Sequence, residues 1–410
     1  MDSLKTYQKM SRGRLILLGT ITIIISLISG LIISEMILRL LRDPNQFLPY
    51  HAKTMKVFYP NEQITPGVTD PSYFTTNTFG TRGPEWRGEP IKILTIGGST
   101  TACTVLDDSE TWPALLMRFL NQEVNDEKKV WVTNSGVDGH HTHHHLMHAK
   151  YLLPLLPKIN YVIVYAGLND AGSWLYQKDF DPHFLENPNN WNTRVGEAFR
   201  VSHFTPANWP WYKHLEIWKR ASVIKNRLMS LQVAKQREEG RITQDAHLQW
   251  LETARQQRQE RRKKLVHQAK METLPAALKA YSINLRHILN FIREIGAEPV
   301  LMAQAIQPSF KNEEERRLFW MGAMEGGEVY LKHEQMFKIL KRYNERMQEI
   351  AVEEGVFFID LPTYLASAKG RLFYDAVHFN ELGAEKVAHV IADFFQKRIL
   401  REVQLKKITD

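Results

Sequence analysis

The chain has 410 residues and a single cysteine, Cys103, so an intramolecular disulfide is excluded and a hydrophobic core must hold the fold. The 53 lysines and arginines outnumber the 45 aspartates and glutamates, and the formal net charge is +8. Part of this excess lies within ten positions, at Arg255, Arg258, Arg261, Arg262, Lys263 and Lys264. We interpret this run as the solvated face of a helix; attraction to anionic lipid or an acidic polymer is the alternative.

Residues 15–34 read LILLGTITIIISLISGLIIS, twenty positions without a charge. As a helix this segment is long enough to cross a hydrocarbon core of about 30 Å. The four basic residues before it predict that residues 1–14 are cytoplasmic and that the chain after Glu35 lies across the membrane. A cleaved signal peptide is the alternative, but the apolar run is longer than usual and no A-x-A-like site follows.

This topology excludes nucleic acid as a partner and predicts a single-pass membrane protein. The chain contains no N-x-S/T sequon, which favours a bacterial inner membrane with the folded part facing the periplasm. Residues 35–90 are rich in Pro, Asn, Thr and Gly and show no regular period, so we expect a linker and approach segment there.

Five short apolar runs follow, separated by segments with helical periodicity. Because the runs are apolar on both faces, they predict the strands of a parallel sheet covered by helices on each side, an α/β architecture over residues 91–400. The predicted strands are 91–97, 130–136, 161–167, 297–304 and 355–360.

About 130 residues separate the third and fourth runs, far more than one crossover helix needs. We therefore expect a largely helical insertion over 173–275. Its second part, 221–270, is charged and favours helix, whereas its first part, 173–220, is rich in tryptophan. The tryptophans form either a lid or binding wall or a small satellite core; they are Trp174, Trp191, Trp209, Trp211 and Trp218.

Polar residues stand directly after several predicted strands. Loops at the carboxyl ends of parallel strands converge on one crevice, so these residues should meet in space. They are Gly97-Gly98-Ser99-Thr100, Asn134-Ser135-Gly136, Gly167-Leu168-Asn169-Asp170 and Asp375-Ala376-Val377-His378.

Ser99 follows two glycines at a strand-to-helix turn, which leaves its hydroxyl open to a substrate. A serine hydroxyl needs a base to become a nucleophile, and His378, oriented by the Asp375 carboxylate, would supply it. The oxyanion of a tetrahedral intermediate requires fixed donors, which the N–H groups of Ser99 and Gly136 and the side-chain amide of Asn169 would provide. The pattern therefore predicts a serine hydrolase with Ser99, His378 and Asp375 as its triad.

At these residues the sequence resembles the SGNH or GDSL-like hydrolase family, whose four named residues fall on Ser99, Gly136, Asn169 and His378. The four blocks read ILTIGGSTT, TNSGVDG, VYAGLND and YDAVHFNELG, and the resemblance covers about 91–170 and 280–398. It implies a flavodoxin-like α/β/α sandwich with a central five-stranded parallel sheet, esterase activity, and no cofactor or metal. Gly98 and Thr100 replace the Asp and Leu of the family's name. This departure bears on the subfamily and the substrate more than on catalysis.

A run of histidines follows the second block: His140, His141, His143, His144, His145 and His148. On a helix several of them would share a face, so a metal site is one interpretation, and a cleft wall or exposed surface is the other. Cys103 is interpreted as a small core residue.

The leading functional hypothesis is hydrolysis of an ester, with an acyl group such as O-acetyl removed from an envelope saccharide or lipid. The same triad would also serve acyl transfer to a sugar hydroxyl, and the sequence does not separate the two reactions. A non-catalytic, membrane-tethered scaffold or binding protein is the third hypothesis.

Overall fold

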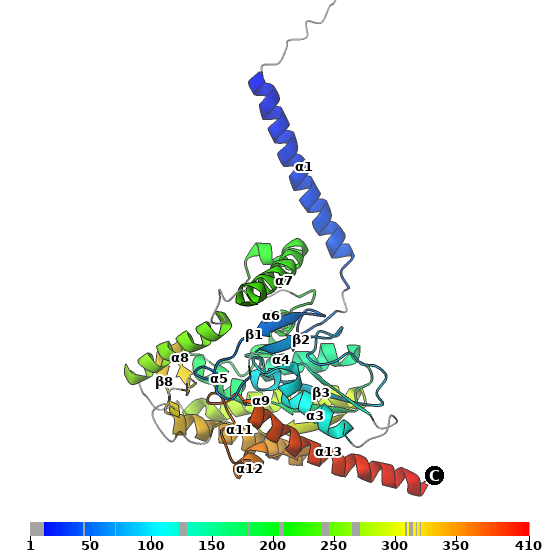
Figure 1. Ribbon diagram of the computed structural model, residues 1–410, viewed down its shortest axis with the longest axis vertical. Coiled ribbons are helices and arrows are strands. Elements are labelled where there is room, and N and C mark those ends of the chain that lie inside the picture. Colours follow the sequence, from blue (N-terminus) through cyan, green and yellow to red (C-terminus); the bar gives the residue numbers. More distant parts are fainter. Residues whose placement is uncertain are drawn as a thin grey trace, which may run out of the picture.

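The computed structural model of the protein describes residues 12–43, 46–69, 71–122, 129–178, 180–204, 209–238, 246–264, 271–307, 310, 315–316, 318–319 and 321–409. The long helix α1 (Arg12–Leu40) projects from the folded body of the chain (Figure 1). By length and composition, its residues Gly13–Leu40 could cross a membrane, and within the described part of the chain no other helix meets this test.

Five parallel strands form the central sheet, in the spatial order β4-β3-β5-β6-β9. Each strand lies at one of the five apolar runs, and the α/β/α fold predicted from the sequence is confirmed. In chain order this arrangement is 2-1-3-4-5, the flavodoxin-like order, with its topological switch point beside the first strand. The strands are β3 (Ile91–Gly97), β4 (Val130–Asn134), β5 (Tyr161–Tyr165), β6 (Glu298–Met302) and β9 (Phe357–Ile359).

Alternate residues of each strand point into two separate cores, one on each face of the sheet. Ile93 and Ile163 belong to the core that includes α3 (Trp112–Asn121) and α13 (Glu381–Thr409). Leu94 and Val162 belong to the other core. The helices on that second face are α4 (Thr142–Met147), α5 (Leu168–Tyr176), α9 (Leu274–Glu294) and α11 (His333–Glu354).

The approach segment is more ordered than its sequence predicts. It contains an antiparallel pair, β1 (Met55–Phe58) and β2 (Ser72–Thr75), and it buries Phe74 and Arg82. The Arg82 guanidinium donates to the carbonyl oxygens of Ala102, Cys103 and Leu106 and pairs with Asp108. Strands of four residues are too short to give a recognisable alternation of apolar and polar residues in the sequence.

Between α5 and α9, where the insertion is expected, the described residues form three further α-helices: α6 (Pro188–Ala198), α7 (Glu216–Glu238) and α8 (Ala246–Lys264). The satellite-core interpretation is wrong for two tryptophans, because Trp174 is buried in the main core and Trp191 packs against it. Trp209, Trp211 and Trp218 are exposed. The remaining elements are short, namely α2 (Ser99–Ala102), α12 (Leu361–Leu365), β7 (Ala323–Met324), β8 (Val329–Tyr330), a π turn (His148–Leu152) and 3-10 turns at Asp108–Glu110, Leu153–Leu155, Phe184–Glu186, Trp211–His214, Met271–Thr273 and Glu325–Gly327.

Candidate active site

Ser99 is the first residue of α2, directly after the central strand β3, and its side chain is partly exposed. The residue before it, Gly98, has little room for a side chain in this arrangement. A Cβ on Gly98 would lie 2.4 Å from Asn169 Nδ2 and 3.0 Å from the His140 carbonyl oxygen. The Asp that names the family would therefore displace the Asn169 amide here, which gives a physical reason for Gly98.

Ser99, His378 and Asp375 form one continuous hydrogen-bonded chain. His378 Nε2 lies 2.8 Å from Ser99 Oγ, and His378 Nδ1 lies 2.8 Å from Asp375 Oδ2. His378 and Asp375 both come from the loop that precedes α13. Asp375 Oδ1 stabilises the conformation of this loop by accepting hydrogen bonds from the N–H groups of Val377 and His378. The arrangement has the geometry by which a serine, an imidazole and a carboxylate act together as a nucleophile.

Asp375 is held as a carboxylate although it is buried. Burial alone would raise its pKa, but the adjacent His378 and the Arg255 guanidinium outweigh burial and hold the pKa well below its usual range. Arg255 Nη2 donates to Asp375 Oδ2 over 3.1 Å, and Arg255 Nη1 donates to the Ile64 carbonyl oxygen over 2.6 Å.

Arg255 corrects the interpretation of the basic run as a solvated face. Its side chain is only 7% exposed, so the run contributes one buried cation to the site. The sequence does hold a signal for it, since Leu248, Leu251 and Arg255 follow one another at helical spacing and all three are buried on α8.

The proton affinity of His378 is set by opposing effects. Burial lowers its pKa, but the charge of Asp375 and the hydrogen bond to it dominate, and the pKa lies above the usual imidazole value. Arg255 acts in the lowering direction. The imidazole of His378 therefore becomes neutral at a higher pH than a free imidazole does.

Two of the three expected oxyanion donors already have partners in this structure. The Gly136 N–H donates to Asn134 Oδ1 over 2.8 Å, and Asn169 Nδ2 donates to the His140 carbonyl oxygen over 2.8 Å. An amide nitrogen carries two hydrogens, so this bond orients Asn169 and leaves its second hydrogen for another acceptor. Asn169 does not cap α5, whose N-cap is Gly167.

The histidine run is not a surface, and that interpretation is wrong. All of its members except the half-buried His143 are buried. Burial lowers the pKa of His148 to about 4 and that of His143 to about 3, so both rings are neutral near pH 7. His148 bridges Ser135 Oγ and the Ala198 carbonyl, while the His140 carbonyl positions Asn169. Among the residues the structure describes, no three His, Cys, Asp or Glu side chains gather as a metal site.

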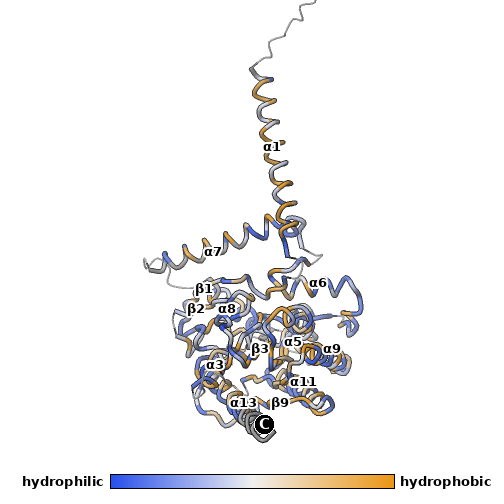
Figure 2. Tube along the Cα trace, turned by 90° about the vertical axis from the view of Figure 1, so that its right-hand side faces the viewer, coloured by the Kyte–Doolittle hydropathy of each residue, from blue (hydrophilic) through white to orange (hydrophobic). Residues whose placement is uncertain are grey.

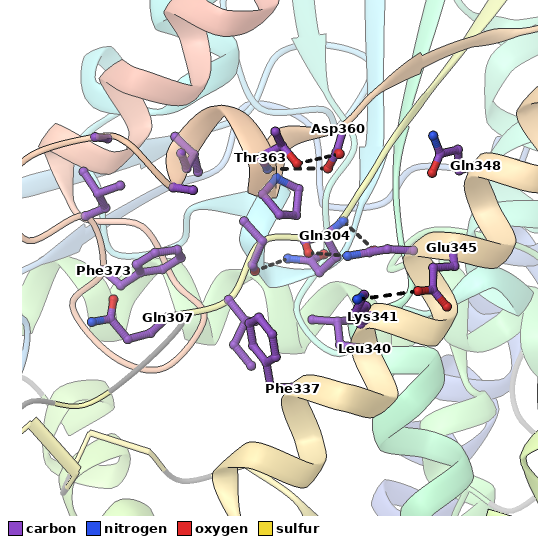
Figure 3. Close-up of a pocket in the computed structure, with 18 of the residues that line it drawn as sticks. Gln304, Gln307, Phe337, Leu340, Lys341, Glu345, Gln348, Asp360, Thr363 and Phe373 are labelled. Carbon is purple, nitrogen blue, oxygen red and sulfur yellow. Dashed lines mark hydrogen bonds and ion pairs between the residues drawn. The ribbon is translucent and has the colours of Figure 1, made fainter.

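A cavity of about 930 Å³ lies between the ends of β6 and β9 and the helices α11 and α12 (Figure 3), and Leu372 and Phe373, at the start of the loop that leads to Asp375 and His378, form part of its wall. Gln304 lines it and contacts Thr100, the neighbour of Ser99, across 3.4 Å. The Gln307 N–H donates to the carbonyl oxygen of Ala376, which lies between Asp375 and His378 in the chain. The walls mix aromatic, amide and charged side chains, among them Phe337, Phe373, Gln348, Lys341 and Glu345.

The model of the GDSL-like Lipase/Acylhydrolase family matches residues 95–386. This range contains most of the sheet and all of the residues considered above as triad and oxyanion donors. The chain belongs to the GDSL-like lipase/acylhydrolase family, and by that membership it is an ester hydrolase.

Solved structures of low sequence identity resemble the chain. An acetylxylan esterase from Geobacillus stearothermophilus, Axe2, is 14% identical, with 74% of this chain and 94% of that chain covered and a TM-score of 0.37. A member of the lipolytic protein G-D-S-L family from Veillonella parvula is 12% identical, with coverages of 75% and 98% and a TM-score of 0.38. No curated protein matches the chain. The family assignment rests on the family model alone.

Proposed function

We propose that the protein is a serine esterase in which Ser99 is the nucleophile, His378 the general base and Asp375 the residue that orients the base. The observation that carries this proposal is the pair of 2.8 Å hydrogen bonds that joins the three side chains. Their assembly from chain segments 279 residues apart argues against a vestigial site in a non-catalytic scaffold.

In the proposed reaction, the Ser99 oxygen attacks the carbonyl carbon of the ester while His378 Nε2 takes the serine proton. Collapse of the tetrahedral intermediate breaks the bond to the alcohol, and the imidazolium returns the proton to that leaving oxygen. Water then attacks the acyl-serine with the same base, which releases the acid and restores Ser99. Throughout, Asp375 accepts from His378 Nδ1 and stabilises the positive imidazolium.

The negative oxygen of the intermediate requires donors fixed before the reaction begins. We assign this role to the Ser99 N–H, at the first position of α2, and to the second hydrogen of the Asn169 amide. The N–H of a helix's first residue has no partner within the helix, which leaves that of Ser99 available. Gly136 would contribute only by sharing the N–H that now bonds Asn134.

We propose that the substrate is an acylated saccharide or lipid of the cell envelope and that the acyl group is short, such as acetyl. The cavity beside the catalytic loop supports this, because its mixture of amide, charged and aromatic walls suits a polar, ring-containing alcohol. We further propose that α1 anchors the chain in the bacterial inner membrane, with the hydrolase domain on the periplasmic side. The length and apolar character of α1 and the basic residues before it support this topology.

A fluorophosphonate probe tests the nucleophile, because it reacts rapidly only with an activated serine. The full chain should be labelled at Ser99, and Ser99→Ala and His378→Ala should both abolish the labelling. Ser135→Ala is a matched control, since Ser135 Oγ also lies near an imidazole, that of His148 at 3.3 Å, but is fully buried. Labelling that persists in both Ser99→Ala and His378→Ala would contradict the triad.

A panel of small esters with acyl chains of increasing length tests the substrate class. Acetyl esters of saccharides should be turned over fastest by the parent chain and not by Ser99→Ala. A preference for long-chain acyl esters would reject the short acyl group while leaving the triad standing.

A further inference from the structure

The helix α7 begins at the point where α1 meets the folded body. The carboxylate of Glu35, near the end of α1, accepts the N–H groups of Glu216 and Ile217, each over 3.0 Å. Arg42 pairs with the Glu216 carboxylate over 2.9 Å. Because a helix N-terminus has free N–H groups, the Glu35 carboxylate acts as a cap supplied from another helix. The start of α7 is therefore fixed at the same level as the end of the proposed membrane span.

From this joint α7 runs sideways, across the direction of α1, on the side of the body that faces α1 (Figures 1 and 2). Its colouring alternates between apolar and polar along its length (Figure 2). A helix that lies across the axis of a membrane span, at the end of that span, runs along the plane of the membrane surface.

One face of α7 carries apolar side chains that no other part of the described chain covers. Ile224, Leu228 and Leu231 follow one another at spacings of four and three, and their exposed fractions are 61%, 61% and 54%. A row of large exposed apolar residues on one helix marks an interaction surface rather than ordinary surface variation.

The ends and flanks of α7 carry the residue types that favour the boundary between water and lipid. Trp211 and Trp218 are exposed at its N-terminal end, where amphipathic indole rings commonly lie at the headgroup level. Exposed basic residues flank the apolar row at Arg220, Lys225 and Lys235. These charges complement anionic phospholipid headgroups.

We propose that α7 is an interfacial helix, which lies in the headgroup layer of the membrane crossed by α1 with Ile224, Leu228 and Leu231 turned toward the acyl chains. Its partner is the anionic phospholipid bilayer. The proposal rests on the membrane anchoring proposed above. Two attachments, one across the bilayer and one along it, would stop the hydrolase domain from turning freely about α1.

The test uses the full chain in nanodiscs of anionic phospholipid, each holding one copy. Leu228→Cys is labelled with a polarity-sensitive fluorophore, and quenching is measured with lipids brominated near the top of the acyl chains. The native thiol does not interfere, because Cys103 is buried and burial raises its pKa to about 12. Tyr364→Cys is the matched control, since Tyr364 is 60% exposed on α12, at the opposite end of the body from α1 (Figure 1).

We expect the label at position 228 to shift its emission to shorter wavelength and to be quenched several times more strongly than the label at 364. Leu231→Cys should behave like Leu228→Cys. Equal, weak quenching at 228 and 364 would overturn the proposal. An emission shift at 228 without quenching by brominated lipid would also overturn it, because another protein surface would then cover α7.

Membrane association of the unlabelled chain is measured separately, by its resistance to alkaline carbonate extraction from vesicles. Release of the chain would contradict anchoring by α1, and with it the interfacial role of α7. A chain that resists extraction but shows no quenching at position 228 would contradict α7 alone. Loss of esterase activity bears on neither result.

Discussion

Arg255→Gln removes the buried cation beside the proposed triad and leaves Ser99, His378 and Asp375 in place. Arg255 and a protonated His378 both contact Asp375 Oδ2, at 3.1 and 2.8 Å. Their nearest nitrogen atoms are therefore no more than about 6 Å apart, and two positive charges at that separation repel by about 3 kcal/mol at an effective dielectric constant of about 20. This repulsion favours the neutral imidazole, which is the form that accepts the serine proton.

We expect the variant to require a higher pH for activity. The sign follows from the base: without Arg255 the pKa of His378 rises further, so less of it is neutral at a given pH. Below the pKa, kcat/KM should fall by roughly a hundredfold, the factor to which about 3 kcal/mol corresponds. At alkaline pH the activities of variant and parent should converge.

The assay is kcat/KM for a small ester between about pH 5 and 10, together with melting temperature. Arg261→Gln is the control, because it removes the same charge from an exposed position on the same helix. An inflection at the same pH in Arg255→Gln and the parent would refute the electrostatic role. A loss of activity that is uniform across the pH range, with a lower melting temperature, would show that Arg255 only holds the loop through its bond to Ile64.

Two further predictions concern the parent site. The activity of the parent should rise with pH through an inflection above 6.5, the usual imidazole value, because Asp375 raises the pKa of His378; a flat profile between about pH 5 and 8 would argue against His378 as the base. Asn169→Ala should lower kcat by about 10²- to 10³-fold and change KM little, as expected for a donor used in the transition state. Its melting temperature should stay close to that of the parent, since Gly167 caps α5, and a destabilised variant with near-normal kcat would reject the oxyanion role.

The sheet could be predicted because its strands are buried on both faces. Ile93 and Leu94 point into different cores, so the strand reads as a continuous apolar run rather than as an alternation. The convergence of Ser99 and Asn169 followed from topology alone, since both residues come directly after neighbouring parallel strands.

The charges that surround the candidate site could not be predicted from the sequence in this way. The cationic partner of Asp375 is Arg255, which lies 120 residues earlier in the chain. Only the packing of α8 decides that the Arg255 side chain is buried while that of Arg261 is exposed. The partners of the Asn169 amide and the Gly136 N–H depend on ångström-scale loop geometry, which short motifs do not encode. Burial of the histidine run likewise follows from packing rather than from composition.

The separation of Ser99 from His378 along the chain sets when the nucleophile can form. The proposed base, His378, is synthesised 279 residues after the serine, almost at the end of the hydrolase domain. Contacts between such distant segments form only after most of the chain has been ordered. Until His378 has packed beside it, the proposed nucleophile Ser99 is an ordinary alcohol, so an incompletely folded chain should be unreactive toward esters. Labelling of Ser99 by a phosphonate should therefore report completed folding. The labelling begins only after the loop that carries Asp375 and His378 has packed beside the serine.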